Sequence, residues 1–257
     1  MMPEHRYPVQ FEDCLKATKY FLRYTRKFDV DSSRVGIAGD SAGGNLAAAV
    51  TMWMTNEVEP NMPKIKLQVL LYPFLQAFDF NLPSHREYNS KSSSCHLYKE
   101  ILVDTAIMYG FKDHGSLEDV CKNKHVSVVT KSKYNSFVNQ GFLEKDMQMR
   151  GGIQPLYDDP NKTLSSLVHD NVVDPYAWPL MATDDMLRKL PMTYVVVMEI
   201  DPLRDDGLIF AERLRRLRVK MELRYWQGLD HSLFNMYHYK HHSIAVDALT
   251  DYLDRHL

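Results

Sequence analysis

The order of apolar strands and helical segments is the feature that most limits what this chain can fold into. Four short apolar runs are predicted to be strands, at 34–39, 65–73, 192–200 and 220–226. Helices with apolar residues along one stripe are predicted beside them, at 8–28, 42–54, 206–219 and 243–257. The run at 192–200 is unbroken and β-branched, which is typical of a strand buried on both faces. This alternation predicts an α/β fold with a mostly parallel sheet, and right-handed crossovers place helices on both of its faces.

The segment at about 76–175 interrupts this alternation. It is polar, rich in Ser, Lys and Asn, and weakly periodic, with one helix predicted at 98–109. We interpret it as a cap insertion that packs over the sheet, within a single domain that spans 1–257. Segments that lie over the C-terminal edge of a sheet commonly select ligands, so we expect this cap to set the preference for acyl and leaving groups.

Composition argues against several classes of function. Hydrophobic residues make up 45% of the 257 residues, enough for a sizeable buried core. The 31 basic and 33 acidic residues give a formal net charge of −2, so neither nucleic acid nor an anionic membrane surface is an expected partner. No apolar run approaches the roughly 18 residues that a membrane span needs, and none is predicted. The expected partner is a small molecule.

Cysteines and histidines give little sign of a metal site. Cys14, Cys95 and Cys121 are too few and too scattered for a disulfide framework, and reduced core thiols are favoured over a single bridge. His238 and His242 stand four residues apart and could share a helix face, but no carboxylate or cysteine joins them at ligand spacing. A solvated helix start explains the two histidines better, and neither metal nor cofactor is predicted.

A serine between small residues marks the turn from the strand at 34–39 to the helix at 42–54. Gly39-Asp40-Ser41-Ala42-Gly43 fits the G-x-S-x-G pattern, and it stands where that pattern requires, after a strand and before a helix. The turn is so sharp that bulky neighbours would clash. It also directs the first helical N–H groups, including that of Ala42, at an oxyanion formed beside Ser41. The alternative is a tight turn with an incidental serine.

A nucleophilic serine needs a base, and the base needs a carboxylate that orients it. Asp201 follows the predicted strand at 192–200, and His231 follows the strand at 220–226. This places serine, acid and histidine in the chain order of α/β-hydrolases, each beyond a strand. GDSAGG is also similar to the serine motif of chymotrypsin-like proteases, which are double β-barrels. Here a helix follows the serine at once and the sheet is predicted to be parallel, so a protease of that class is rejected. By themselves, Asp201 could be a turn residue and His231 a surface histidine. We expect Asp205 and Asp206 to cap the helix that follows.

Four stretches together resemble the hormone-sensitive-lipase-like branch of the α/β-hydrolases: PEHRYPVQFEDC from Pro3, GDSAGGNLAAA from Gly39, YPFL from Tyr72 and DPLRDDG from Asp201. Within that branch the chain is similar to arylacetamide deacetylase and its vertebrate paralogues. The resemblance implies Ser41 as nucleophile, Asp201 as orienting acid and His231 as base. It implies a carboxylesterase or deacetylase that hydrolyses esters and small amides through an acyl-enzyme, without a cofactor. It further implies the endoplasmic reticulum, lumenal or membrane-associated, with which the glycosylation sequon at Asn161 agrees.

The chain departs from that family's pattern at the oxyanion loop. The family carries a His-Gly-Gly-Gly loop ahead of the PEH segment, and no His-Gly-Gly sequence occurs here. Of the usual donors only the N–H of Ala42 remains, and loss of one donor typically costs ~10²–10³ in rate. We expect an N-terminally shortened chain with about four of the family's usual eight strands, in which the strand at 34–39 is an exposed edge. The alternative function is a catalytically impaired or inactive isoform that acts by binding. In addition, Ser232 follows His231 where the family usually has glycine.

Overall fold

A parallel β-sheet forms the centre of the molecule. The computed structural model describes residues 4–90, 96–112, 114–153 and 159–257. Within these residues the sheet has four strands, β1 (Gly36–Asp40), β2 (Leu67–Leu71), β3 (Met192–Ile200) and β4 (Met221–Asp230), in the spatial order β1-β2-β3-β4. Every neighbouring pair is parallel. The predicted α/β class is therefore confirmed, and β1 lies at one edge of the described sheet.

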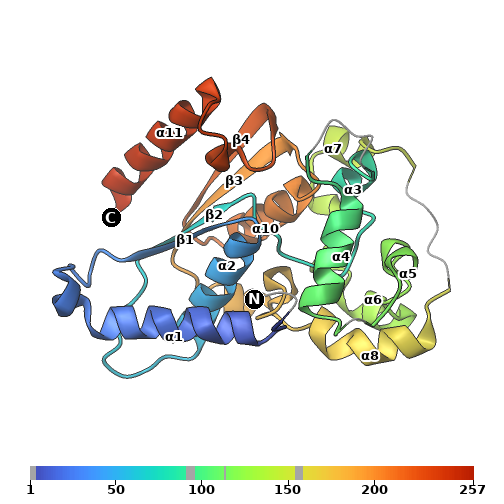
Figure 1. Cartoon of the computed structure of the whole chain (residues 1–257), viewed down its shortest axis with the longest axis horizontal. Helices are drawn as coiled ribbons and strands as arrows, with labels where there is room; N and C mark the ends of the chain where they lie inside the picture. Colours follow the sequence, from blue (N-terminus) through green and yellow to red (C-terminus); the bar gives the residue numbers. More distant parts are fainter. Residues whose placement is uncertain (1–3, 91–95, 113, 154–158) are drawn as a thin grey trace.

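Helices cover both faces of this sheet because successive strand side chains point to opposite sides (Figure 1). Val195 and Val197 of β3 belong to the core shared with α2 (Ala42–Asn56) and α10 (Arg204–Arg216). Tyr194 and Val196 belong to a second core, whose helix is α11 (Lys240–His256). The outer helix α1 (Val9–Arg23) packs on α2 through a smaller apolar cluster. All four predicted strands and all four predicted helices beside them are present, with bounds shifted by a few residues.

The segment between β2 and β3 is helical to a greater extent than the sequence predicts. Its elements are α3 (Pro83–Glu87), α4 (Lys99–Tyr109), α5 (Leu117–Cys121), α6 (Val128–Tyr134), η2 (Gln140–Phe142), α7 (Lys145–Met149), α8 (Lys162–Val172), η3 (Pro179–Met181) and α9 (Asp184–Leu187). Side-chain oxygens of Ser116, Ser127 and Asn161 accept N–H bonds at the starts of α5, α6 and α8. The polar residues that weaken the periodicity here therefore serve as helix N-caps. Figure 1 shows α3 to α8 gathered on the right of the molecule, whereas η3 and α9 contact α2.

Short 3₁₀ turns complete the described elements, namely η1 (Thr25–Phe28) and η4 (Leu233–Asn235). The helix predicted at 8–28 thus ends at Arg23 and continues as η1. The arginines between the apolar residues of the helix predicted at 206–219 are expected to face solvent, and for Arg213 this expectation is wrong. Arg213 is 4% exposed and donates to the carbonyl oxygens of Leu180 and Ala182, at 2.6 and 2.7 Å.

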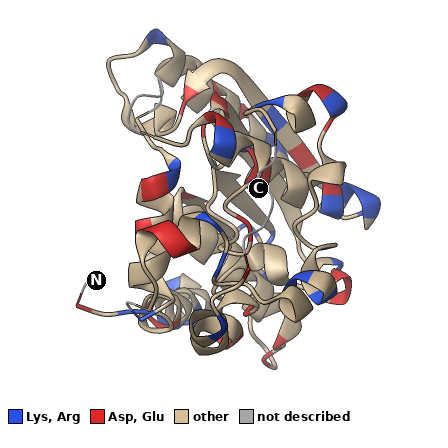
Figure 2. Ribbon diagram, turned by 90° about the vertical axis from the view of Figure 1, so that its right-hand side faces the viewer, with Lys and Arg blue, Asp and Glu red and all other residues tan. Residues whose placement is uncertain are grey.

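The surface and the thiols add three observations. Basic and acidic residues are interspersed over the face seen in Figure 2. No helix in the described parts of the chain is long and apolar enough to cross a membrane. Cys14 and Cys121 are free thiols, and Cys95 lies outside the described residues.

Candidate active site

Ser41 occupies a strained turn between β1 and α2. Its backbone angles are φ 54° and ψ −119°, in a region that side-chain-bearing residues rarely adopt. Gly39 is required by the same turn, because a Cβ atom there would lie 2.1 Å from the carbonyl oxygen of Gly43. A Cβ on Gly44 would lie 2.9 Å from the Cβ of Pro73. The run of small residues in the sequence thus follows from the close approach of β1, α2 and the loop after β2.

Three side chains from distant parts of the chain meet at this turn. His231 Nε2 lies 3.0 Å from Ser41 Oγ, and His231 Nδ1 lies 2.8 Å from Asp201 Oδ2. Asp201 follows β3 and is fully buried, and His231 follows β4 and is 5% exposed. The other carboxylate oxygen of Asp201 accepts the N–H of Leu203 at 2.8 Å, which fixes the orientation of the carboxylate. The structure therefore brings together the three residues that the sequence singled out.

The loop that carries His231 is shaped by its neighbours. The ring of His231 packs against Tyr72, with ring centroids 4.6 Å apart. Ser232 adopts a left-handed conformation, with φ 72°, which explains why glycine suits the position after the histidine. Asn235 donates to Asp40 Oδ2 at 3.1 Å and so ties this loop to the residue before Ser41. Burial raises the pKa of the Tyr72 hydroxyl, so this group stays neutral beside the imidazole.

The N-terminus of α2 faces the serine. Ala42 is the first residue of α2, so its N–H has no acceptor within the helix. The N–H of Ser41 itself is engaged, because it donates to the carbonyl oxygen of Leu71 at 2.9 Å. The positive end of the α2 dipole adds to the attraction for negative charge at this point. We call the turn around Ser41 the elbow, and the backbone N–H of Ala42 is its donor that can point at an oxyanion.

Asp205 and Asp206 do not cap α10, in contrast to the sequence expectation. Both lie inside the first turn of α10 and are fully buried. Asp205 Oδ2 accepts the N–H of Ser84 at 2.7 Å, and Asp206 Oδ2 accepts that of Leu75 at 3.0 Å. The two carboxylates hold the segment after β2 instead of the helix end. Burial raises the pKa of Asp206 well above its ordinary value, although its hydrogen bonds oppose this.

Asn45 is a positioning residue that the sequence analysis did not identify. Its side-chain Nδ2 donates to the carbonyl oxygens of Phe74 and Ala177, at 2.8 and 2.9 Å. It thereby joins α2 to the loop after β2 and to the segment before β3. Only its place one turn after Ser41 could have drawn attention to it.

His238 and His242 do not share a helix face, because His238 precedes α11 and only His242 lies within it.

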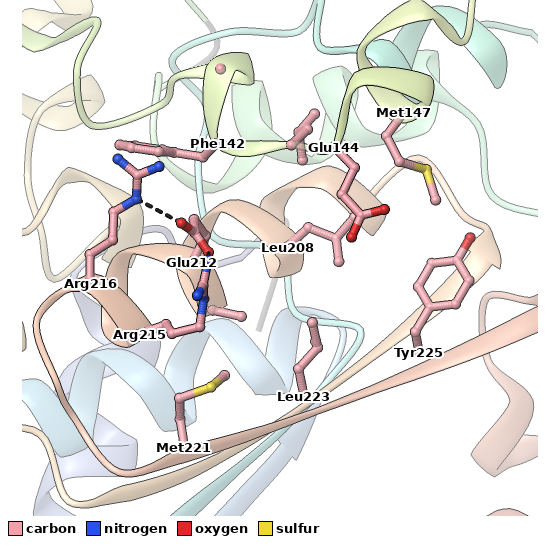
Figure 3. A pocket seen from close by; sticks show the side chains of 13 residues that line it. Phe142, Glu144, Met147, Leu208, Glu212, Arg215, Arg216, Met221, Leu223 and Tyr225 are labelled. Carbon is pink, nitrogen blue, oxygen red and sulfur yellow. Dashed lines mark hydrogen bonds and ion pairs between the residues drawn. The ribbon is translucent and has the colours of Figure 1, made fainter.

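Two cavities lie near these elements. One of about 180 Å³, which we call the elbow cavity, is lined by Ala42 and by side chains of α1, α2, α4 and the loop after β2. The other, of about 600 Å³, lies between α10, β4 and the segment from η2 to α7 (Figure 3). There Glu144 and Tyr225 point into the space, and Glu212 is paired with Arg215 and Arg216. Neither cavity has Ser41 or His231 in its lining, but the elbow cavity reaches Ala42, the residue after Ser41, whereas the larger one does not.

Comparison with known proteins identifies the family. A sequence profile described as alpha/beta hydrolase fold matches residues 1–137 and 153–235 of this chain. The chain belongs to the alpha/beta hydrolase fold family. Human arylacetamide deacetylase-like 2 is 38% identical over 223 residues, which cover 86% of this chain and 54% of that protein. Bovine arylacetamide deacetylase is 37% identical over 238 residues, covering 90% and 57%. Rat neutral cholesterol ester hydrolase 1 is 34% identical over 233 residues, covering 88% and 55%.

This alpha/beta hydrolase thus spans about half the length of the curated relatives it matches. Solved esterases share its fold. The carboxylesterase EstE1 from a metagenomic library superposes with a TM-score of 0.70 at 24% identity, covering 99% of this chain and 66% of that one. Carboxyl esterase 2 from Tuber melanosporum superposes with a TM-score of 0.69 at 21% identity, covering 99% and 65%. The predicted family and fold are confirmed.

Proposed function

We propose that this chain is a serine hydrolase in which Ser41 is the nucleophile, His231 the general base and acid, and Asp201 the orienting carboxylate. The observation that carries the proposal is the continuous hydrogen-bonded line from Asp201 through His231 to Ser41, at 2.8 and 3.0 Å. Serine at its ordinary pKa is a weak nucleophile, and an adjacent imidazole held by a carboxylate is the arrangement that activates it.

The geometry supports a two-step reaction. Ser41 Oγ attacks the substrate carbonyl carbon while His231 Nε2 takes the hydroxyl proton, and the carbonyl oxygen becomes an oxyanion that the N–H of Ala42 stabilises. Collapse of this intermediate breaks the bond to the leaving group, which receives the proton from His231. Water then attacks the acyl-enzyme, gives a proton to His231 and releases the acid, and the proton returns to Ser41. Every group required for these transfers belongs to the chain or to water, so no cofactor takes part.

We propose small carboxylic esters and amides as the substrates. Support comes from relatives named as deacetylase and cholesterol ester hydrolase, and from solved neighbours named as esterases. The elbow cavity of about 180 Å³ is below the usual range for a whole drug-sized ligand, so it suits one part of a substrate. We further propose that residues 76–175 act as the cap of a single domain, because Thr105 and Tyr109 of α4 line that cavity.

A second candidate is a binding protein with little or no turnover. It is favoured by the donor set at the elbow, where the N–H of Ser41 is bonded to Leu71 and Ala42 is the donor that points at the oxyanion. Removal of one donor to the oxyanion typically lowers the rate by ~10²–10³, so a site that relies on the Ala42 N–H alone would turn over slowly. A chain of this kind would still hold an acyl ligand against Ser41, and would react once with a strong electrophile.

Covalent labelling distinguishes the two candidates. The purified chain is treated with a fluorophosphonate probe and assayed with p-nitrophenyl acetate, alongside Ser41→Ala and Ser33→Ala, an exposed serine in the turn before β1. The hydrolase proposal expects labelling and turnover in the wild type and in Ser33→Ala, and neither in Ser41→Ala. Labelling that persists in Ser41→Ala contradicts the nucleophile assignment. Labelling without turnover favours the binding protein.

We propose the endoplasmic reticulum as the compartment, from the resemblance to arylacetamide deacetylase. Asn161 of the sequon is exposed, and its Nδ2 donates to the half-buried carboxylate of Asp119, at 3.2 Å. A glycan there would displace one surface hydrogen bond. Expression in mammalian cells, followed by endoglycosidase H, tests the proposal. A mobility shift that Asn161→Gln abolishes supports a lumenal location, and an unshifted band in the wild type contradicts it.

A further inference from the structure

Strand β4 contains a bulge shortly before His231. The parallel pairing of β3 with β4 shifts between Met198 and Ile200, so that residues 227–229 of β4 lie opposite Glu199 alone. Such a bulge bends its strand and redirects the side chains that follow it, and bulges of this kind are frequent next to active sites. The direction of His231 therefore depends on the conformation of this bulge.

The bulge decides which side chain of β4 lies level with Asp201. The register that β4 keeps as far as Trp226 would place Leu229 at that level. Pairing resumes at Asp230, and His231 then stands at the level of Asp201 instead. The contact of 2.8 Å between Asp201 Oδ2 and His231 Nδ1 follows from this shift in register.

The carboxylate of Glu199 bonds to the middle of the bulge. Its Oε2 accepts the N–H of Gly228 at 2.8 Å. Gly228 has φ 72°, in the left-handed region that favours glycine, so the bulge has a defined conformation that this bond stabilises. A hydrogen bond to an ionised acceptor is roughly twice as strong as one between neutral groups. Glu199 thus acts on the backbone of β4, three residues before the histidine.

The other carboxylate oxygen of Glu199 is held by the proposed cap. Arg150, which follows α7, donates from Nη2 to Glu199 Oε1 at 2.7 Å, and α7 lies beside the carboxyl end of β3 (Figure 1). The side chains of Arg150 and Glu199 are 31% and 16% exposed, so this ion pair is partly shielded from water. The bonds from Arg150 and Gly228 hold the pKa of Glu199 below its ordinary value, which keeps the carboxylate ionised.

We propose that Glu199 is a positioning residue that sets the place of His231, and that Arg150 couples this role to the cap. The carboxylate of Glu199 fixes the bulge, the bulge sets the register, and the register places the imidazole between Asp201 and Ser41. A displacement of about 1 Å at a catalytic group can lower a rate by ~10². This inference rests on the proposed function and names the residues that hold its general base.

The kinetics of fluorophosphonate labelling test the role of Glu199 in the full chain, after circular dichroism has shown that each variant is folded. Glu199→Leu should lower the maximal labelling rate ~10²-fold and leave the affinity for the probe unchanged, because Glu199 contacts β4 and not the reacting atoms. Glu199→Gln keeps a neutral acceptor, so the rate should fall only ~10-fold. Glu212→Leu is the matched control and should label at the wild-type rate. The side chain of Glu212 is 15% exposed and also pairs with arginines, but on α10.

Arg150 tests the coupling to the cap and does not require a stable Glu199 variant. Arg150→Met removes the cation from Glu199 Oε1 and should lower the maximal labelling rate ~10-fold. Arg150→Lys keeps a positively charged donor and should recover most of this loss. Equal labelling rates in the two variants would contradict the coupling, and an unchanged rate in Glu199→Leu would contradict the positioning role.

The tautomer of His231 separates failure of this inference from failure of the proposed function. Nitrogen-15 NMR of histidine-labelled Ser41→Ala at alkaline pH, assigned with His231→Gln, shows which ring nitrogen carries the proton. We expect one tautomer, protonated at Nδ1, and a mixture when Glu199→Leu or Arg150→Met is added. One tautomer in all three proteins would overturn the inference and leave the proposed function intact. The expected change in a chain that never labels at Ser41 would support the inference and contradict the proposed function. A mixture already present in Ser41→Ala would contradict both.

Discussion

Arg204 is the buried cation that joins α10 to the segment after β2, and its removal tests how that junction is held. The side chain is fully buried. Its Nε donates to Asp205 Oδ1 at 3.0 Å, and its Nη1 donates to Glu87 Oε2 at 2.8 Å and to the carbonyl oxygen of Glu199 at 3.2 Å. Asp205 in turn accepts the N–H of Ser84. The positive charge of Arg204 therefore stabilises the ionised carboxylate of Asp205, which burial disfavours.

The expected cost of Arg204→Met follows from the burial of its two partners. Breaking a buried ion pair from one side costs ~3–5 kcal/mol, because the other charge remains buried. The side chain of Glu87 is 26% exposed and can regain water, whereas that of Asp205 is fully buried. The uncompensated charge is thus mainly that of Asp205, and we expect a loss near the lower limit, about 3 kcal/mol. This is a large part of a typical domain stability of ~5–15 kcal/mol.

The loss should also depend on pH, in a direction that the structure fixes. Burial raises the pKa of Asp205 above its ordinary value of 3.8, and Arg204 is the main group that lowers it. Without Arg204 the folded-state pKa rises further. A group whose pKa is raised by folding stabilises the fold below its unfolded value and loses that contribution as pH rises through the folded value. Arg204→Met should therefore be less destabilised at pH 5 than at pH 8.

Urea unfolding followed by circular dichroism at both pH values measures these differences. Arg216→Met is the matched control, because Arg216 belongs to the same helix and pairs with Glu212 at an exposed site. We expect it to change stability by no more than ~0.5 kcal/mol. The double variant Arg204→Met/Asp205→Asn should be more stable at pH 8 than Arg204→Met. A loss in Arg204→Met equal to that in Arg216→Met, or one that grows on acidification, would refute the reasoning.

The sequence predicts most of the sheet and of the site because those signals are local. The run at 192–200 is β-branched and buried on both faces, and it coincides with β3. Gly39, two residues before Ser41, is required by a contact with Gly43, only four positions along the chain. Chain order then places Asp201 and His231 beyond two parallel strands, whose carboxyl ends meet at one edge. Local pattern and one topological rule are sufficient to bring the three side chains together.

The sequence does not predict the contacts whose partners are distant and of unexpected type. Asp205 has the position of a helix cap, but its partner Ser84 lies 121 residues away. Arg213 has the pattern of an exposed arginine, but its acceptors are carbonyl oxygens of Leu180 and Ala182, which no side-chain pattern marks. In each case a buried backbone group needed a partner, and a charged side chain on α10 was close enough to supply it.

Two further substitutions test the elbow itself. Gly39→Ala should cost ~3 kcal/mol or more in urea unfolding, because its Cβ would lie 2.1 Å from the backbone oxygen of Gly43. Gly43→Ala meets nothing closer than 3.7 Å and should be tolerated, so equal losses would contradict the steric argument. Asp201→Asn keeps the size of the side chain but donates to His231 Nδ1, which holds the imidazole in the tautomer that cannot accept the Ser41 proton. The rate of fluorophosphonate labelling, measured in samples quenched at successive times, should therefore fall by ~10³–10⁴-fold. Substitution of the exposed Asp251 by Asn should leave this rate unchanged. If Asp201→Asn labels at the wild-type rate with its fold intact, the imidazole does not act as the base, and the hydrogen-bonded line has no catalytic role.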